Sequence, residues 1–384
     1  MTSPLGGDFV ARPDAVLAGL RERCPVARVR TPAGQPVWLV TREADVRAAF
    51  LDPRLSLRGG PPKPDRPHRA MDMTLVNYDP PDHTRIRRLA APAFTPGRVA
   101  AHRRRTEQLA ADHLAQLGTP AAVDLMADFA EPFAFAVLCE VFGIPGAAAG
   151  RLHRSVTDLI RHRDTERAVD ELDAVIREQL ADRRAAPGDD AFSTVLHTWE
   201  ASGEATEAEL VDLLAMLVLA GFDSTVQMLG LAVLALLDHP AELARLRADP
   251  ALMPRAVDEL LRWDTPGPFA TRRRALTDVT IGGTVIPEGS GVLLSVAAAN
   301  RDPRGRAAPD RLDLTRPGGS RHLTFGAGPH YCLGAALAKL ELTAALTALL
   351  HHWPAIRLAR PAASLTWTGG HQHRRLTALP LLLT

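Results

Sequence analysis

Residues 325–334 read FGAGPHYCLG and carry a cysteine to the start of an apolar segment. At a helix N-terminus, free backbone N–H groups and the helix dipole stabilise anions. We therefore expect the Cys332 thiol to ionise more readily than a solvated cysteine, and a thiolate can bind a metal. The residues leave two alternatives open, an inert buried cysteine and a phosphate-cradling loop. The phosphate alternative is weaker, because Tyr331 stands where the dinucleotide fingerprint needs glycine and no Lys-Ser/Thr pair follows.

A second chemical segment, AGFDST at residues 220–225, interrupts the long apolar stretch Leu210 to Leu237. Glycine, an acid and two hydroxyls are costly inside an apolar helix unless they line a wet cavity or bond one another. The plainer alternative is a packing glycine with a Ser/Thr side chain bonded to a backbone carbonyl. Thr206 and Glu209 have capping-box spacing, which predicts that this helix begins at Glu207.

Two charged pairs have helical spacing. His83 and Arg87, at i and i+4, lie on one helix face and could bind one anion, although a solvated basic face fits the spacing equally. Glu259 and Arg262, at i and i+3, would contribute about 0.3 to 0.5 kcal/mol as an exposed pair.

The segment at 325–334 resembles the haem-binding signature of the cytochrome P450 family, Phe-Gly-x-Gly-x-His-x-Cys-x-Gly, at every fixed position. The resemblance implies haem b as cofactor, with Cys332 as the thiolate ligand and metal-binding residue. It further implies that His330 contacts a haem propionate and that Phe325 shields the sulfur. Gly326 and Gly334 would let the backbone pass close to the porphyrin.

Other segments extend this resemblance. His83 and Arg87 follow Asp-Pro-Pro, as in the propionate-binding helix of bacterial members, and Arg273 matches a third propionate arginine. The Glu259–Arg262 pair matches a buried structural motif that a further arginine joins. Residues 220–225 match the segment that meets the cofactor, at Ala220, and carries the acid–alcohol pair.

The acid–alcohol pair implies proton relay for Asp223 and stabilisation of dioxygen for Ser224. The common pattern has threonine directly after the acid, whereas here Ser224 takes that place and Thr225 follows about 100° further round the helix. We keep Thr225 as a further catalytic candidate. Serine is freer at χ1 than threonine, so we expect turnover to be competent but more weakly coupled, with some peroxide released.

The implied reaction inserts oxygen: R–H, O₂, two electrons and two protons give R–OH and water. A ferredoxin and its NAD(P)H-dependent reductase would supply the electrons, docking over Cys332 with Lys339 and Arg103 to Arg105 as candidate contacts. The expected substrate is a mostly apolar small molecule, a bacterial secondary metabolite such as a polyketide or macrolide. The substrate-facing positions by analogy are Met71, Met73, Leu75, Val76, Met216, Leu219, Ala220, Pro266, Gly267, Phe269 and Ala270, with Trp367 nearby.

Two alternatives to hydroxylation or epoxidation remain open. The same haem site could perform oxidative coupling, ring formation or desaturation. More remotely, the chain could be a non-catalytic helical binding protein in which Cys332 is only packed.

Composition narrows the class of protein. The 384 residues include 45 basic and 44 acidic side chains, so the net charge of +1 gives no reason to expect a nucleic-acid partner. A 46% hydrophobic share indicates a folded chain. Three scattered cysteines argue against a disulfide framework. The start of the chain lacks a signal-peptide pattern and the apolar stretch is broken by polar residues, so we expect a cytoplasmic protein without a membrane span. We also expect it to be a monomer.

We expect residues 1–384 to form one mainly α domain, a triangular helical prism with small β-sheets. The haem would lie between the long central helix and the cysteine loop. Helices are predicted at 83–93, 98–117, 121–142, 147–184, 207–237, 241–248, 253–263 and 333–352, strands at 26–30 and 37–41, a hairpin at 279–286 and an exposed loop at 59–67.

Overall fold

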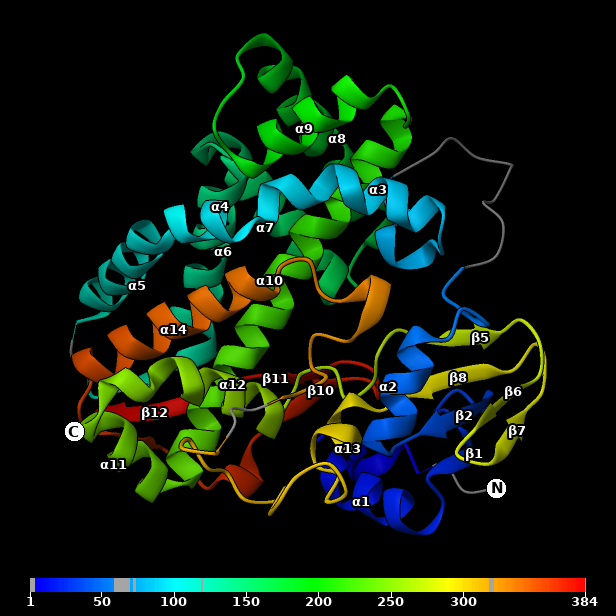
Figure 1. The fold of residues 1–384 in the computed structure, drawn as a ribbon. Helices are drawn as coiled ribbons and strands as arrows, with labels where there is room; N and C mark the ends of the chain where they lie inside the picture. The colour runs from blue at the N-terminus through cyan, green and yellow to red at the C-terminus, as the bar shows by residue number, and fades with distance from the viewer. Residues whose placement is uncertain (1–3, 59–69, 72–73, 119, 318–320, 384) are drawn as a thin grey trace.

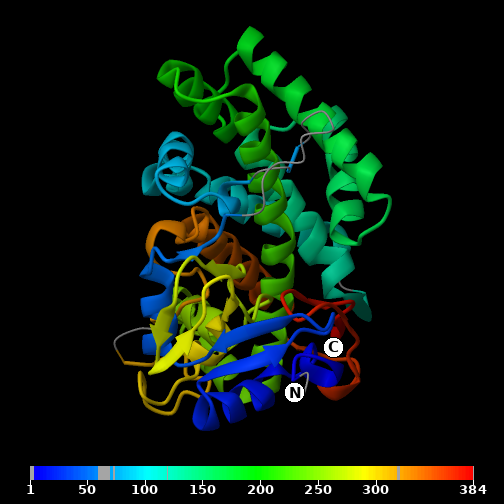
Figure 2. The ribbon, with the colours of Figure 1, turned by 90° about the vertical axis from the view of Figure 1, so that its right-hand side faces the viewer.

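The computed structural model describes residues 4–58, 70–71, 74–118, 120–317 and 321–383. Helices make up most of the molecule, and the labelled strands all lie in its lower half (Figure 1). In the view turned by 90°, a mostly helical part lies at the top, and the sheets and both termini lie below it (Figure 2). This mainly α architecture confirms the predicted fold class.

The helices are α1 Pro13–Arg23, α2 Glu43–Leu51, α3 Asp82–Ala90, α4 Pro96–Ala101, α5 Arg103–Leu117, α6 Glu131–Phe142, α7 Gly146–Ile160, α8 Thr165–Ala185, α9 Ala191–Ser202, α10 Glu207–Asp238, α11 Pro240–Ala248, α12 Met253–Trp263, α13 Val296–Asn300 and α14 Ala335–His352. The strands are β1 Val26–Arg30, β2 Pro36–Val40, β3 Leu55–Ser56, β4 Ala122–Asp124, β5 Arg273–Ala275, β6 Val279–Ile281, β7 Thr284–Ile286, β8 Gly291–Leu294, β9 Ile356–Leu358, β10 Trp367–Gly369, β11 Arg374–Leu376 and β12 Pro380–Leu383.

The largest sheet has the strand order β1-β2-β8-β5-β3, in which β2 and β8 are parallel and the other pairs antiparallel. A three-stranded sheet, β4-β12-β9, brings the C-terminal strand against the segment before α6. Two hairpins complete the β structure, β6-β7 and β10-β11. The predicted β6-β7 hairpin is confirmed, because Gly282 and Gly283 turn at φ 53° and 79°, where L-residues are strained.

Helix α10 runs from the helical part into the part that contains the sheets and is mostly buried on all sides (Figures 1 and 2). Its capping box is present, since Thr206 and Glu209 each bond the backbone of the other. Among the described residues, α10 is also the one helix long and apolar enough to cross a membrane. Because 67% of its most apolar stretch is buried inside the protein, it is the core helix of a soluble fold.

Several predicted helix boundaries were wrong. The single helix expected at 147–184 is two helices, α7 and α8, because His162 and Asp164 adopt left-handed φ angles of 51° and 39° between them. The helix expected at 98–117 is divided into α4 and α5 at His102. The helix expected at 121–142 begins instead with strand β4 and a π-helical segment, Leu125–Ala130, before α6.

Helix α9 was not predicted at all. Its sequence is rich in residues of low helix propensity, and its stability comes from packing of Phe192, Val195 and Trp199 into the core. The loop expected at 59–67 lies outside the described residues.

Candidate functional site

A cavity of about 850 Å³ lies between α10, α3, the loop before α14 and the β10-β11 hairpin. Its wall contains every candidate site residue from the sequence: His83, Arg87, Ala220, Asp223, Ser224, Thr225, Arg273, Phe325, Gly326, His330, Cys332 and Gly334. The fold therefore brings four distant segments to one place. Their individual roles remain predictions.

The cysteine loop is a series of tight turns. Gly326 has a φ of 73°, and the backbone N–H of Cys332 donates to the Phe325 carbonyl at 2.9 Å. The turn faces the cysteine side chain into the cavity, three residues before α14 begins at Ala335. A glycine at 326 is needed because an L side chain is strained at this φ.

The expected easy ionisation of Cys332 was wrong for the protein alone. Burial raises the pKa of the Cys332 thiol, and this effect outweighs the bond from the Gly334 N–H and the charge of Arg87, which both lower it. Burial therefore opposes the effect of the helix terminus on this thiol. A bound cation would supply the missing positive charge, since coordination deprotonates a thiol.

Buried cationic and imidazole groups with unsatisfied ring or guanidinium nitrogens face the same space. His83 is 1% exposed, and neither of its ring nitrogens has a hydrogen-bond partner among the described residues. Its ring packs on His330 with 3.9 Å between centroids. Arg273 is also buried, its Nε is unpartnered within the described chain, and burial lowers its pKa to about 10. These orphaned groups fit the propionates of a haem.

The acid and the hydroxyls on α10 have partners within the fold. Arg375 Nε donates to both carboxylate oxygens of Asp223, at 3.0 and 2.9 Å. Ser224 Oγ donates to the Ala220 carbonyl at 2.7 Å, and Thr225 Oγ1 donates to the Gly221 carbonyl at 3.2 Å. The plainer alternative, local hydroxyl–carbonyl bonding, is thus realised in residues that also line the cavity.

Glu341 on α14 was missed by the sequence analysis. It lines the cavity, is 4% exposed, and its Oε2 has no hydrogen-bond partner within the described ranges. Burial raises its pKa to about 8 in spite of a hydrogen bond with Thr225, so the carboxyl is mostly neutral at pH 7. A charged residue inside an apolar helix was the signal that could have found it.

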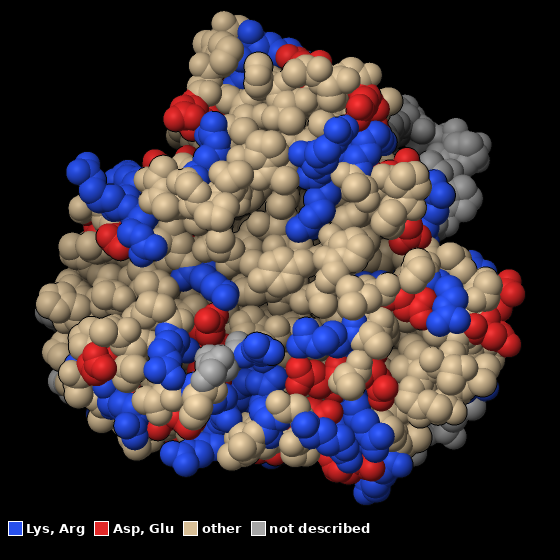
Figure 3. Space-filling view, in the orientation of Figure 1, with Lys and Arg blue, Asp and Glu red and all other residues tan. Residues whose placement is uncertain are grey.

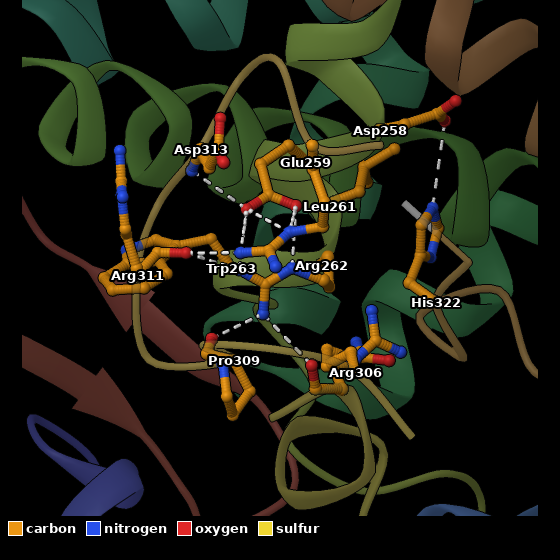
Figure 4. Close-up of polar contacts among 12 residues, drawn as sticks. Asp258, Glu259, Leu261, Arg262, Trp263, Arg306, Pro309, Arg311, Asp313 and His322 are labelled. Carbon is orange, nitrogen blue, oxygen red and sulfur yellow. Dashed lines mark hydrogen bonds and ion pairs between the residues drawn. The ribbon is translucent and has the colours of Figure 1, made fainter. Parts of the chain in front are cut away.

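The Glu259–Arg262 pair is fully buried, as the resemblance implied. Arg262 donates twice to Glu259, through Nε and Nη2, at 2.7 Å each. Arg316 joins the same carboxylate at 3.2 Å, and the carbonyls of Asn300 and Pro309 accept from Arg262 Nη1. Figure 4 shows Glu259, Arg262 and Pro309 within this network. This network ties α12 to the loops that precede the cysteine segment.

Most expected substrate positions line the cavity, namely Leu75, Val76, Met216, Leu219, Ala220, Pro266, Gly267, Phe269 and Ala270. Met71 and Trp367 pack against the core and are absent from the described part of the wall, and Met73 lies outside the described residues. The wall also has polar members that the sequence analysis did not name, His371, Gln372 and His373 on the β10-β11 turn.

Charged groups outside the cavity are largely paired. Lys339 contacts Asp258 at 2.7 Å and lies over the Phe325 ring, while Arg103 and Arg105 pair with glutamates. On the face in Figure 3, basic and acidic side chains are interspersed around a mostly uncharged centre, and the outline is roughly triangular. Cys24, Cys139 and Cys332 are free thiols, which agrees with the expected absence of a disulfide framework.

Comparison with known proteins assigns the family. A sequence model described as Cytochrome P450 matches residues 158–356. The chain is 37% identical to 6-deoxyerythronolide B hydroxylase of Saccharopolyspora erythraea over 388 residues, covering 95% of each chain. It superposes on the bacillaene polyketide synthase P450 PksS of Bacillus subtilis with a TM-score of 0.93, 34% identity and full coverage of both chains.

A proposed thioether synthase, SgvP, involved in tailoring griseoviridin, is 36% identical, with a TM-score of 0.86 and coverage of 96% of this chain and 95% of that one. The fold agrees with these relatives, whose names are those of enzymes, and this excludes the alternative of a non-catalytic binding protein. This chain belongs to the cytochrome P450 family and is a soluble bacterial monooxygenase with a haem-thiolate cofactor that works with redox partners.

Proposed function

We propose that this enzyme hydroxylates or epoxidises a large, mostly apolar secondary metabolite, such as a polyketide or macrolide. The observation that carries the proposal is the cavity, whose volume of about 850 Å³ would hold haem and substrate together and whose proposed substrate positions are mostly apolar. Burying apolar groups of a substrate against such a wall drives binding. The named substrate of 6-deoxyerythronolide B hydroxylase is of this class.

Haem b is the proposed form of the cofactor. When bound, it supplies the activation of dioxygen. Cys332 would hold the iron, and His83, Arg87, His330 and Arg273 would bind the propionates. This placement would bring a negative charge to the buried Arg273, whose Nε has no hydrogen-bond partner among the described residues, and would give His83 a hydrogen-bond partner.

The protein's own side chains would deliver protons and would hold water or dioxygen in the cavity. Asp223 would pass protons from water to the cavity, and Ser224 would hold a cavity water or dioxygen through its hydroxyl. Thr225 would assist proton delivery through its hydrogen bond with Glu341. A ferredoxin and its NAD(P)H-dependent reductase would deliver the electrons on the Cys332 side in the cytoplasm, to a monomeric enzyme.

The direct test uses 6-deoxyerythronolide B as probe with the reconstituted holoenzyme, ferredoxin, reductase and NADPH. Binding should shift the Soret band, and the product should gain the mass of one oxygen atom. Loss of two hydrogens instead would favour coupling, ring formation or desaturation, which the likeness to SgvP keeps as the second candidate. If a small charged molecule such as glutamate shifted the band while macrolides did not, the proposed substrate class would be wrong.

The alcohol position provides a second prediction. Ser224→Thr should raise the product formed per NADPH, because β-branched threonine holds its hydroxyl in fewer rotamers. Ser224→Ala should lower this ratio about tenfold, the equivalent of one strong hydrogen bond, with more hydrogen peroxide released. Both ratios are measured from NADPH, peroxide and product. Unchanged coupling in Ser224→Ala would contradict the role of the hydroxyl.

A further inference from the structure

Strand β11 packs against α10 and contacts Asp223, the proposed relay acid. Arg375 on β11 bonds both oxygens of Asp223 through Nε, and its Nη1 donates to the Ile160 carbonyl at the end of α7 at 2.7 Å. Asp223 is part of the described cavity wall, whereas Arg375 is not. The arginine therefore contacts the carboxylate without itself forming part of the described cavity wall.

A second bond ties the same strand to the next turn of α10. The backbone N–H of Leu376 donates at 2.8 Å to Oε1 of Gln227, a buried residue four positions after Asp223. The preceding turn is tight, since a Cβ at Gly369 would lie 2.1 Å from the His373 carbonyl oxygen and Gly369 has a φ of 89°. The hairpin can therefore hold Arg375 at a fixed position along the axis of α10, next to Asp223.

The physical effect of this contact is on the orientation of the carboxylate. An aspartate side chain that faces a cavity can adopt several rotamers, but charge-assisted bonds from one guanidinium select the rotamer that satisfies them. The two side chains are 22% and 21% exposed, so water can still reach the pair. Arginine stays protonated in proteins, so Arg375 can hold the acid without itself exchanging a proton.

We propose that Arg375 is the positioning residue of the proton relay, holding the Asp223 carboxylate at the cavity wall. The inference rests on the proposed relay role of Asp223. Two protons are consumed for each oxygen inserted, and each would pass from water to Asp223 and then to water in the cavity. Without Arg375 the carboxylate would turn away for part of the time, and proton delivery would slow while haem and substrate binding would persist.

The test compares two ways of driving the holoenzyme with 6-deoxyerythronolide B. The first uses NADPH, ferredoxin, reductase and O₂, and needs delivered protons. The second uses hydrogen peroxide, which brings its own oxygen, electrons and protons, since R–H and H₂O₂ give R–OH and water. Peroxide released per NADPH is also measured, because it reports failed proton delivery even when the probe is a poor substrate.

The variants are Arg375→Gln, Arg375→Lys, Asp223→Asn and the double variant, with Arg357→Gln as the matched control. Arg357 is exposed on β9 and makes no side-chain hydrogen bond or ion pair with the described residues. We expect Arg375→Gln to lower product per NADPH about tenfold, the equivalent of one charge-assisted hydrogen bond, and to change the peroxide-driven rate less than about twofold. Arg375→Lys should restore much of the loss, and Arg357→Gln should behave as the parent.

The double variant separates positioning from general damage, because two residues that act as one unit give non-additive losses. It should be no worse than Asp223→Asn alone. If Asp223→Asn loses coupling while Arg375→Gln keeps it, the positioning role is wrong and the relay stands. If Asp223→Asn itself keeps full coupling, the relay proposal fails. Equal losses in both routes for Arg375→Gln would mean a purely structural role.

Discussion

Cys332→Ala is expected to abolish NADPH-driven oxygen insertion and to remove the red-shifted Soret band of the reduced, carbon monoxide-treated enzyme. The cysteine sulfur is the proposed iron ligand and faces the cavity, and alanine has no atom that can replace it. Absorption spectra of the reduced protein, with and without carbon monoxide, measure the effect alongside product formation.

Cys139→Ala is the matched control. Cys139 is also a free thiol, on α6, and burial raises its pKa to about 11, so it is an inert core cysteine. This variant should keep the band and the activity. A band that survives Cys332→Ala in folded, haem-loaded protein would leave Cys332 as a packed residue and remove the basis for the proposed cofactor site.

Glu259→Gln is expected to cause the largest loss of stability, about 3 to 5 kcal/mol, because it removes the counter-charge of a buried ion pair. Arg262 and Glu259 are 0% and 1% exposed, so water cannot compensate for the lost charge. Arg316 would lose the same partner. A loss of this size is a large fraction of the stability of an ordinary domain, so soluble yield and haem content should fall with the thermal unfolding midpoint.

Glu107→Gln tests whether any lost glutamate–arginine pair has this effect. Its pair with Arg103 is 3.9 Å long and more than half exposed on both sides, so the midpoint should hardly change. Equal behaviour of the two variants would mean that the buried network contributes no more than a surface ion pair. A stable, haem-loaded Glu259→Gln protein would contradict the prediction outright.

Much of the site follows from short segments of sequence. The cysteine loop, the His83–Arg87 pair and the Asp223–Ser224 pair are each contained within ten residues, where chain geometry alone sets which side chains are neighbours. The α10 cap and the glycine turn of β6-β7 follow from the same local rules. These segments predicted the family, the cofactor class and the candidate residues that the fold then places on one cavity wall.

Other features depend on contacts between segments that are distant in sequence. Asp223 and Arg375 are 152 positions apart, and nothing near either residue indicates the other. The raised pKa values of Cys332 and Glu341 come from burial, which depends on what packs around them. Helix α9 and the break between α7 and α8 likewise depend on packing and on backbone angles at single residues.

The sequence by itself therefore determined the family, the chemistry and the residues that lie close along the chain, because helix and turn geometry acts over a few residues. Only the tertiary structure decided which distant groups meet, which of them lose water, and hence how their charges are balanced. The reason is that desolvation and ion pairing are properties of a three-dimensional neighbourhood, and long-range packing creates that neighbourhood.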